Sequence, residues 1–232
     1  MLSCRYATIG IYHMKAKFTL AALCLLFVGA ANAELIKTDY KTTGDELATL
    51  DTETGIEWLD ISETAGYNLN EISALIAEGG ELEGWRMPTR TEVTDLFMML
   101  FDGNISSGEN TSSNYASQIA NLHDFFGYTS YKATDGYDRA YGLYRRDDNG
   151  EIRMAGTRGS SIVFINYDHA VYSDTYTNAV YGTWLVSDGG TTMSSINNPA
   201  LNANNPASPY RVPVEGIGLF GLAGLLLRRK SR

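Results

Sequence analysis

The apolar residues of this chain follow a helical period in three stretches of its first half. The first stretch begins after Asn68 and has apolar positions on one face of a helix. The second follows Thr89, and Glu92 three residues later completes the sequence pattern of a capping box. The third runs from residue 115 to 125, with Asn114 as the expected N-cap. These patterns predict three short helices.

Short apolar runs bounded by turn residues predict β-hairpins on both sides of these helices. The first hairpin pairs residues 46–50 with residues 56–59 across a turn that ends in Gly55. The second pairs residues 141–145 with residues 151–155 across a turn rich in Asp and Asn.

Two more β-rich runs, residues 161–167 and 180–186, complete a set of antiparallel strands. An order of hairpin, helices and strands is typical of an α+β fold, whereas parallel sheets need alternating strands and helices. We therefore expect a single α+β domain over residues 34–187, with an antiparallel sheet and two to three helices. Residues 188–211 are rich in Gly, Thr, Ser, Asn, Pro and Ala and lack periodicity, which predicts a flexible linker.

The N-terminal residues have the order of a secretory signal peptide. Two lysines precede the apolar run at residues 18–30, and Ala31 and Ala33 follow at the spacing of a cleavage site. We expect residues 1–33 to be removed after Ala33. Met14 is an alternative start of translation, because the residues before it fit no part of this order.

The last stretch, residues 212–232, combines a short Val-Pro motif, an apolar run and a basic end. The run at residues 216–227 would rise about 18 Å as a helix, against a hydrocarbon core of about 30 Å, so it is a marginal membrane span. The basic residues after it hold such a segment's end on the cytoplasmic side. The residues that carry the pattern are Val212, Pro213, Glu215, Gly216, Arg228, Arg229 and Lys230.

A signal peptide at one end and this tail at the other resemble a PEP-CTERM-type sorted protein. The family's usual core is Val-Pro-Glu-Pro, whereas this chain has Val212-Pro213-Val214-Glu215. The resemblance implies an exported protein of the cell envelope or extracellular matrix, associated with exopolysaccharide. It also implies that an exosortase-like enzyme processes the chain at the inner membrane before it reaches the cell surface or medium. A permanently membrane-anchored periplasmic protein is the alternative.

The body carries a second resemblance, to the DUF1566 or Lcl C-terminal type of domain. Three segments carry it, at residues 51–58, 84–93 and 182–186. The resemblance implies a shape related to C-type-lectin-like folds. We expect Trp85 to lie in the core and Arg86 to pair with a carboxylate or with backbone carbonyls. The residues of the motif are Trp58, Gly84, Trp85, Arg86, Pro88, Thr89, Glu92 and Trp184.

The charge and the cysteines of the chain exclude several classes of function. The chain has 27 acidic against 18 basic residues and a net charge of −9, which argues against nucleic acid as a partner. Its two cysteines, Cys4 and Cys24, both precede the expected cleavage site. The mature protein would therefore have no disulfide, no thiolate metal site and no cysteine nucleophile.

One turn offers oxygen ligands that can hold Ca²⁺, although it lacks the order of an EF-hand. An exposed hairpin turn is the simpler interpretation, and no other cofactor is expected. Its candidate ligands are Asp147, Asp148, Asn149 and Glu151, with Asp102, Asp135 and Asp138 as further carboxylates.

Nothing in the sequence forms a known catalytic motif, so we expect a binding protein rather than an enzyme. His123 and His169 remain in the body, but no nucleophile elbow or HExxH zinc motif accompanies them. The many tyrosines of the second half stack on sugar rings or serve as packing. A polysaccharide hydrolase is the alternative, and it would need two acidic groups roughly 5 to 9.5 Å apart in a cleft.

Overall fold

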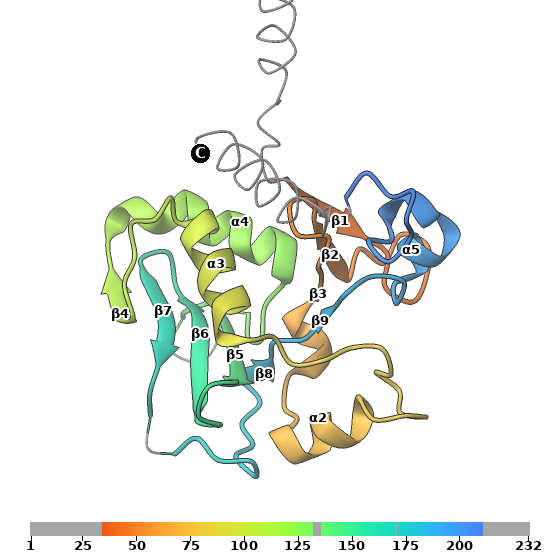
Figure 1. Ribbon diagram of the computed structural model, residues 1–232. Helices are drawn as coiled ribbons and strands as arrows, with labels where there is room; N and C mark the ends of the chain where they lie inside the picture. Colours follow the sequence, from red (N-terminus) through yellow and green to blue (C-terminus); the bar gives the residue numbers. More distant parts are fainter. Residues whose placement is uncertain (1–33, 132–135, 170, 211–232) are drawn as a thin grey trace, which may run out of the picture. The chain divides into compact units, whose positions relative to one another are not determined.

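The computed structural model describes residues 34–131, 136–169 and 171–210, which form one α+β domain with two sheets and three main helices (Figure 1). None of the helices in these three ranges is both long and apolar enough to cross a bilayer. The expected signal peptide, the sorting tail and Asp135 lie outside the described residues.

The smaller sheet has the strand order β1-β2-β3-β9, and each neighbouring pair is antiparallel. The first predicted hairpin is confirmed as β2 and β3. Asp51 shapes its turn, because the carboxylate accepts hydrogen bonds from the Glu53 N–H at 2.9 Å and the Thr54 hydroxyl at 2.8 Å. The strands are β1 (Leu35–Thr38), β2 (Ala48–Asp51), β3 (Glu57–Leu59) and β9 (Val186–Ser187).

The larger sheet has the strand order β4-β7-β6-β5-β8. The second predicted hairpin is confirmed as β5 and β6, but β8 runs parallel to β5, so the sheet is only mostly antiparallel. The single strand predicted at residues 180–186 is therefore wrong: β8 joins the larger sheet, β9 joins the smaller one, and Trp184 lies between them. The strands are β4 (Gly108–Thr111), β5 (Arg139–Arg145), β6 (Ile152–Arg158), β7 (Ile162–Tyr167) and β8 (Tyr181–Thr183).

Side-chain caps start the first two of the three main helices. Asn68 and Thr89 both form complete capping boxes, and the one at Thr89 is the box that the sequence predicts. The cap expected at Asn114 is wrong, because Ser112 caps a 3-10 turn, η3 (Ser113–Tyr115), that leads directly into the third helix. The three helices are α2 (Leu69–Leu75), α3 (Arg90–Leu100) and α4 (Ala116–Phe126), and a further 3-10 turn is η2 (Ile61–Thr64).

Both faces of the larger sheet are covered. Alternate residues point to opposite faces, so Ala140 and Tyr144 face α3 and α4, while Tyr141 and Leu143 face the start of α2 and the segment before β8. Figure 1 shows α3 and α4 side by side at one end of this sheet and α2 at the other. The buried Trp184 lies in the cluster that joins α3 and α4 to both sheets.

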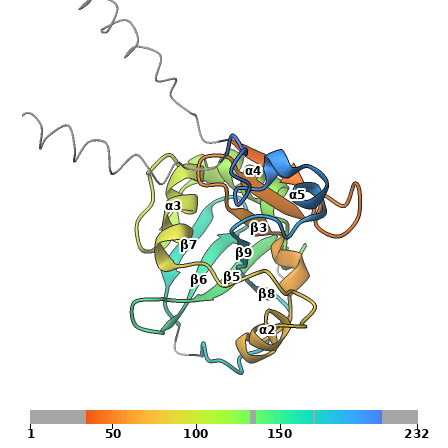
Figure 2. The ribbon, with the colours of Figure 1, turned by 45° about the vertical axis from the view of Figure 1, so that its right-hand side comes forward.

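The segment that the sequence assigns to a flexible linker is folded against the body over residues 188–210. It contains α5 (Met193–Asn197) and η4 (Pro199–Leu201), and α5 lies beside the smaller sheet in both views (Figure 1, Figure 2). Its Thr192 hydroxyl donates to the buried Glu57 carboxylate at 2.5 Å. The linker prediction is wrong because side-chain hydrogen bonds and helix caps fix this segment against the body. Contacts of this kind do not produce a periodic pattern of apolar residues, so the sequence gives no sign of them.

Glu57 is expected to make the stability of the fold depend on pH. Burial raises the pKa of Glu57, and the Thr192 and Ser195 hydroxyls oppose that rise. A carboxyl group whose pKa is higher in the folded chain than in the unfolded chain stabilises the fold at pH values below its unfolded-state pKa. This stabilisation is lost as the pH rises through the folded-state pKa. We therefore expect Glu57→Gln to flatten the dependence of the urea midpoint on pH above about pH 4, where an ordinary glutamate begins to ionise. Glu78→Gln, at an exposed position, serves as the control, and equal pH slopes for wild type and Glu57→Gln would contradict this assignment.

Candidate functional site

The Gly-Trp-Arg-Met-Pro-Thr motif holds the start of α3 against the end of the smaller sheet. Arg86 donates to both Glu92 oxygens at 2.7 and 2.9 Å and to Asp188 at 2.6 Å, which confirms the expected carboxylate pairing. The bonds to Glu92, and then those to Asp188, raise the pKa of Arg86. Trp85 is buried and makes an edge-to-face contact with Tyr40. The motif therefore has a structural role.

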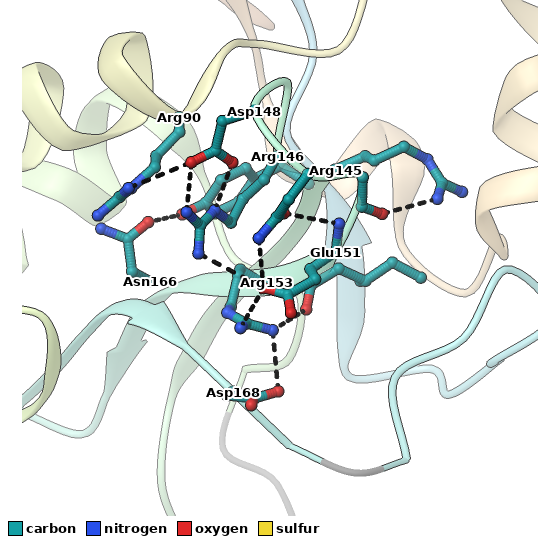
Figure 3. A network of polar contacts seen from close by, with 12 residues as sticks. Arg90, Arg145, Arg146, Asp148, Glu151, Arg153, Asn166 and Asp168 are labelled. Carbon is teal, nitrogen blue, oxygen red and sulfur yellow. Dashed lines mark hydrogen bonds and ion pairs between the residues drawn. The ribbon is translucent and has the colours of Figure 1, made fainter.

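Arginine side chains surround the hairpin turn with the candidate Ca²⁺ ligands and form ion pairs with its carboxylates (Figure 3). Asp148 pairs with Arg146 and with Arg90, and Glu151 pairs with Arg153 at 2.6 Å and Arg146 at 3.4 Å. These carboxylates thus meet guanidinium groups instead of converging on one point. Within residues 34–131, 136–169 and 171–210, no cluster of three His, Cys, Asp or Glu residues can hold a metal ion.

The other two candidate ligands of the turn also have local partners. Asp147 accepts a hydrogen bond from the backbone N–H of Arg90 at 3.0 Å, where a carboxylate is favoured by the N-terminus of α3. The Asn149 amide donates to Glu151 at 2.8 Å. The turn therefore fixes the β5–β6 hairpin to the start of α3.

Both histidines have local partners among the described residues. His123 Nε2 is 2.8 Å from the Thr157 hydroxyl, and burial lowers the pKa of His123 to about 4, so the ring is neutral at physiological pH. Thr157 is fully buried, so no substrate can reach its hydroxyl. His169 is exposed and packs beside Tyr172.

Most tyrosines of the second half fall into two groups, and Tyr144 belongs to neither because it is buried in the cluster with α3 and α4. One group packs around Phe164 on the face of the larger sheet that α2 covers, where it serves as core: Tyr141, Tyr167, Tyr172, Tyr176 and Tyr181. The other group, Tyr128, Tyr131 and Tyr137, is exposed. Packing thus accounts for most of the tyrosine enrichment.

A pocket of about 380 Å³ lies between α3 and β7. Its wall is rich in hydroxyl, amide and carboxylate groups, and Met98, Ile105 and Ile165 give it an apolar part. Arg90, which is shown in Figure 3, lines it near the start of α3. The polar lining residues are Thr91, Thr94, Asp95, Ser106, Ser107 and Asn166.

Asn166 holds an unusual conformation in this pocket. Its φ of 50° is in the left-handed region, which asparagine tolerates better than most residues. Its side chain accepts a hydrogen bond from the buried Tyr144 hydroxyl and donates to Thr94 at 3.5 Å. These bonds fix the Asn166 amide between the core of the sheet and the pocket.

A second pocket, of about 480 Å³, lies on the other side of α3. The β2–β3 turn lines it with Asp51, Glu53 and Thr54, and α3 lines it with Glu92, Asp95 and Met99. Sequence reasoning missed both pockets, because their residues come from segments that are far apart along the chain and form no motif.

Asp95 lines both pockets and is exposed. Its carboxylate makes no hydrogen bond or ion pair with any residue that the structure describes. The carboxylate of Glu53 likewise has no such partner within the described ranges. Both groups are therefore available to a ligand.

No family model matches this chain, and no curated protein or solved structure matches it significantly.

Proposed function

We propose that this chain is an exported protein of the cell envelope or extracellular matrix whose body binds a glycan without cleaving it. The pocket between α3 and β7 carries the glycan part of this proposal. Sugar hydroxyls both donate and accept hydrogen bonds, and the pocket offers Asp95, Asn166 and four hydroxyl groups to them. Its apolar side chains fit the CH faces of a sugar ring, and its volume is within the usual range of small-ligand sites.

The two ends of the sequence support the proposed export. A signal peptide cleaved after Ala33 would send the chain across the inner membrane, and the tail would hold it there. An exosortase-like enzyme would then process the tail and free the protein for the surface or the medium. Mass spectrometry of the protein recovered from the cell surface tests this route. An intact C-terminal Arg232 in that protein would contradict the proposed processing of the tail.

The alternative is a protein that keeps its tail as a permanent membrane anchor in the periplasm. In that case, deletion of the host's exosortase would leave the size and location of the protein unchanged.

The finer fold assignment is part of the same proposal. We place the body with DUF1566-like domains, whose shape is related to C-type lectins, on the strength of the motif between Gly84 and Glu92. The capping box at Thr89 and the pairing of Arg86 with Glu92 support it, because they give these three motif residues a defined place.

Glycan binding is expected to depend on Asp95. A glycan array screened with the full chain, with and without Ca²⁺, identifies the ligand. Asp95→Asn is then expected to weaken binding about tenfold, the effect of losing one charge-assisted hydrogen bond. Isothermal titration calorimetry measures the Kd, and Glu78→Gln is the matched control at an exposed position outside both pockets. An unchanged Kd in Asp95→Asn would mean that the glycan does not bind in the pocket beside Asp95.

A hydrolase acting on polysaccharide is the second candidate, because the second pocket brings several carboxylates together. Asp51 and Glu92 are held by structural hydrogen bonds, which leaves Glu53 and Asp95 as the pair that would act. Such an enzyme would release reducing ends from the bound glycan and lose this activity in Glu53→Gln. Binding without release favours the lectin-like function.

A further inference from the structure

We infer that the two pockets form one binding site and that its ligand is a glycan chain rather than a single sugar. This inference rests on the proposed function and specifies its ligand. The shared residue is Asp95, which stands on the exposed side of α3 and belongs to both pockets.

The spacing of residues on α3 explains why the pockets lie on opposite sides of one ridge. Thr91, Thr94 and Met98 follow each other at intervals of three and four, and they face the first pocket. Glu92 and Met99 lie on the neighbouring stripe and face the second pocket. Asp95 lies between the two stripes, so a ligand that crosses the helix passes over its carboxylate.

The width of the helix sets the minimum length of the ligand. An α-helix with its side chains is about 10 Å across, which is more than one sugar ring covers. Each pocket is by itself large enough for one sugar residue, at about 380 and 480 Å³. At least two linked sugar residues are therefore needed to fill both pockets at once.

The charges around the two pockets select against anionic chains. Glu53 and Asp95 carry carboxylates that no described residue neutralises, and the chain as a whole has a net charge of −9. Arg90, at the first pocket, is already paired with Asp148. A uronate or sulfate group near this site would face like charges, so the ligand is a neutral or amine-bearing chain.

Calorimetry with the full chain and sugars of defined length tests the inference. The probes are cello-oligosaccharides and chitosan oligomers from monomer to hexamer, with oligogalacturonates as the anionic series. We expect the affinity to rise about tenfold or more between the monomer and the shortest oligomer that fills both pockets, and then to level off. Oligogalacturonates are expected to bind more weakly than either of the other series at low salt.

Variants on the two sides of α3 complete the test. Glu53→Lys, in the second pocket only, is expected to weaken binding of neutral oligomers and leave monomer binding in the first pocket unchanged. Ser107→Ala, in the first pocket, is expected to weaken the binding of both the oligomers and the monomer. Glu78→Gln is expected to change neither affinity. An affinity independent of chain length would overturn the two-pocket site but leave the proposed function standing. Failure of all three series and of every glycan on the array to bind would overturn both the two-pocket site and the proposed glycan binding. Tight binding of oligogalacturonates would overturn the charge selectivity.

Discussion

Replacing Trp184 with alanine is expected to lower the free energy of unfolding by about 4 kcal/mol. Trp184 is fully buried and makes edge-to-face contacts with Trp58, Phe97 and Phe126, at ring-centre distances of 5.8 to 6.0 Å. Its indole N–H also donates to the Ala155 carbonyl at 3.1 Å. The variant would leave a cavity between the helices and both sheets, and urea denaturation followed by circular dichroism measures its cost.

Two further variants separate the contributions of Trp184. Trp184→Phe keeps an aromatic ring but loses the N–H donor, so it is expected to cost about 1 to 2 kcal/mol less than alanine. Ile196→Ala, at an exposed position, is the control and is expected to change stability by less than about 0.5 kcal/mol. A loss below about 1 kcal/mol for Trp184→Ala would mean that the two sheets do not depend on this side chain.

The elements that the sequence predicts well are those that local residues determine. Thr89 and Glu92 start α3 by bonding to each other's backbone, so the helix can be read from two positions three residues apart. The β5–β6 hairpin likewise depends on its Asp- and Asn-rich turn, and the pairing of Arg145 with Ile152 continues directly from it. Such elements need no information from the rest of the fold.

The elements that the sequence predicts poorly depend on distant partners. Residues 180–186 have a continuous β pattern, and only the positions of β5 and β3 decide that its two ends join different sheets. The segment at residues 188–210 is held by Glu57 and Tyr40, which precede it by more than a hundred residues. No period or turn motif records these long-range polar contacts.

The candidate site shows the same division. The charged turn at residues 147–151 is conspicuous in the sequence, yet the structure engages its side chains with arginines and backbone groups. The pockets on α3 instead use ordinary residues of the helix's polar face, such as Thr94 and Asp95. Their chemistry appears only when the fold brings β7 and the β2–β3 turn to the two sides of the helix.

Helix α3 serves the core and the candidate site with different faces. Val93 and Phe97 are fully buried, whereas Asp95 is exposed between them in sequence. Because the buried face and the exposed face of α3 are separate, changes at Asp95 should alter ligand binding without disturbing the packing of the core. The stability of Asp95→Asn therefore checks that a loss of glycan binding has a local cause.

Gly142→Ala is the second change expected to have a large effect, a loss of about 3 kcal/mol of stability. Gly142 lies on β5 against Trp184, and an added methyl group would collide with the indole ring and lie 2.6 Å from Ile61 Cδ1. Both neighbours are fully buried, so neither can move into solvent to make room. The collision would also disturb the hydrogen bond from Trp184 to Ala155.

A double-mutant cycle shows whether this cost comes from the indole ring. In a Trp184→Leu background the smaller side chain leaves space for the new methyl group, so Gly142→Ala should cost at least about 1 kcal/mol less there than in the wild type. Urea denaturation of the four proteins gives the coupling energy directly. Strictly additive losses would assign the cost of Gly142→Ala to Ile61 or to the strand backbone, and they would remove Trp184 as the reason that this position is glycine.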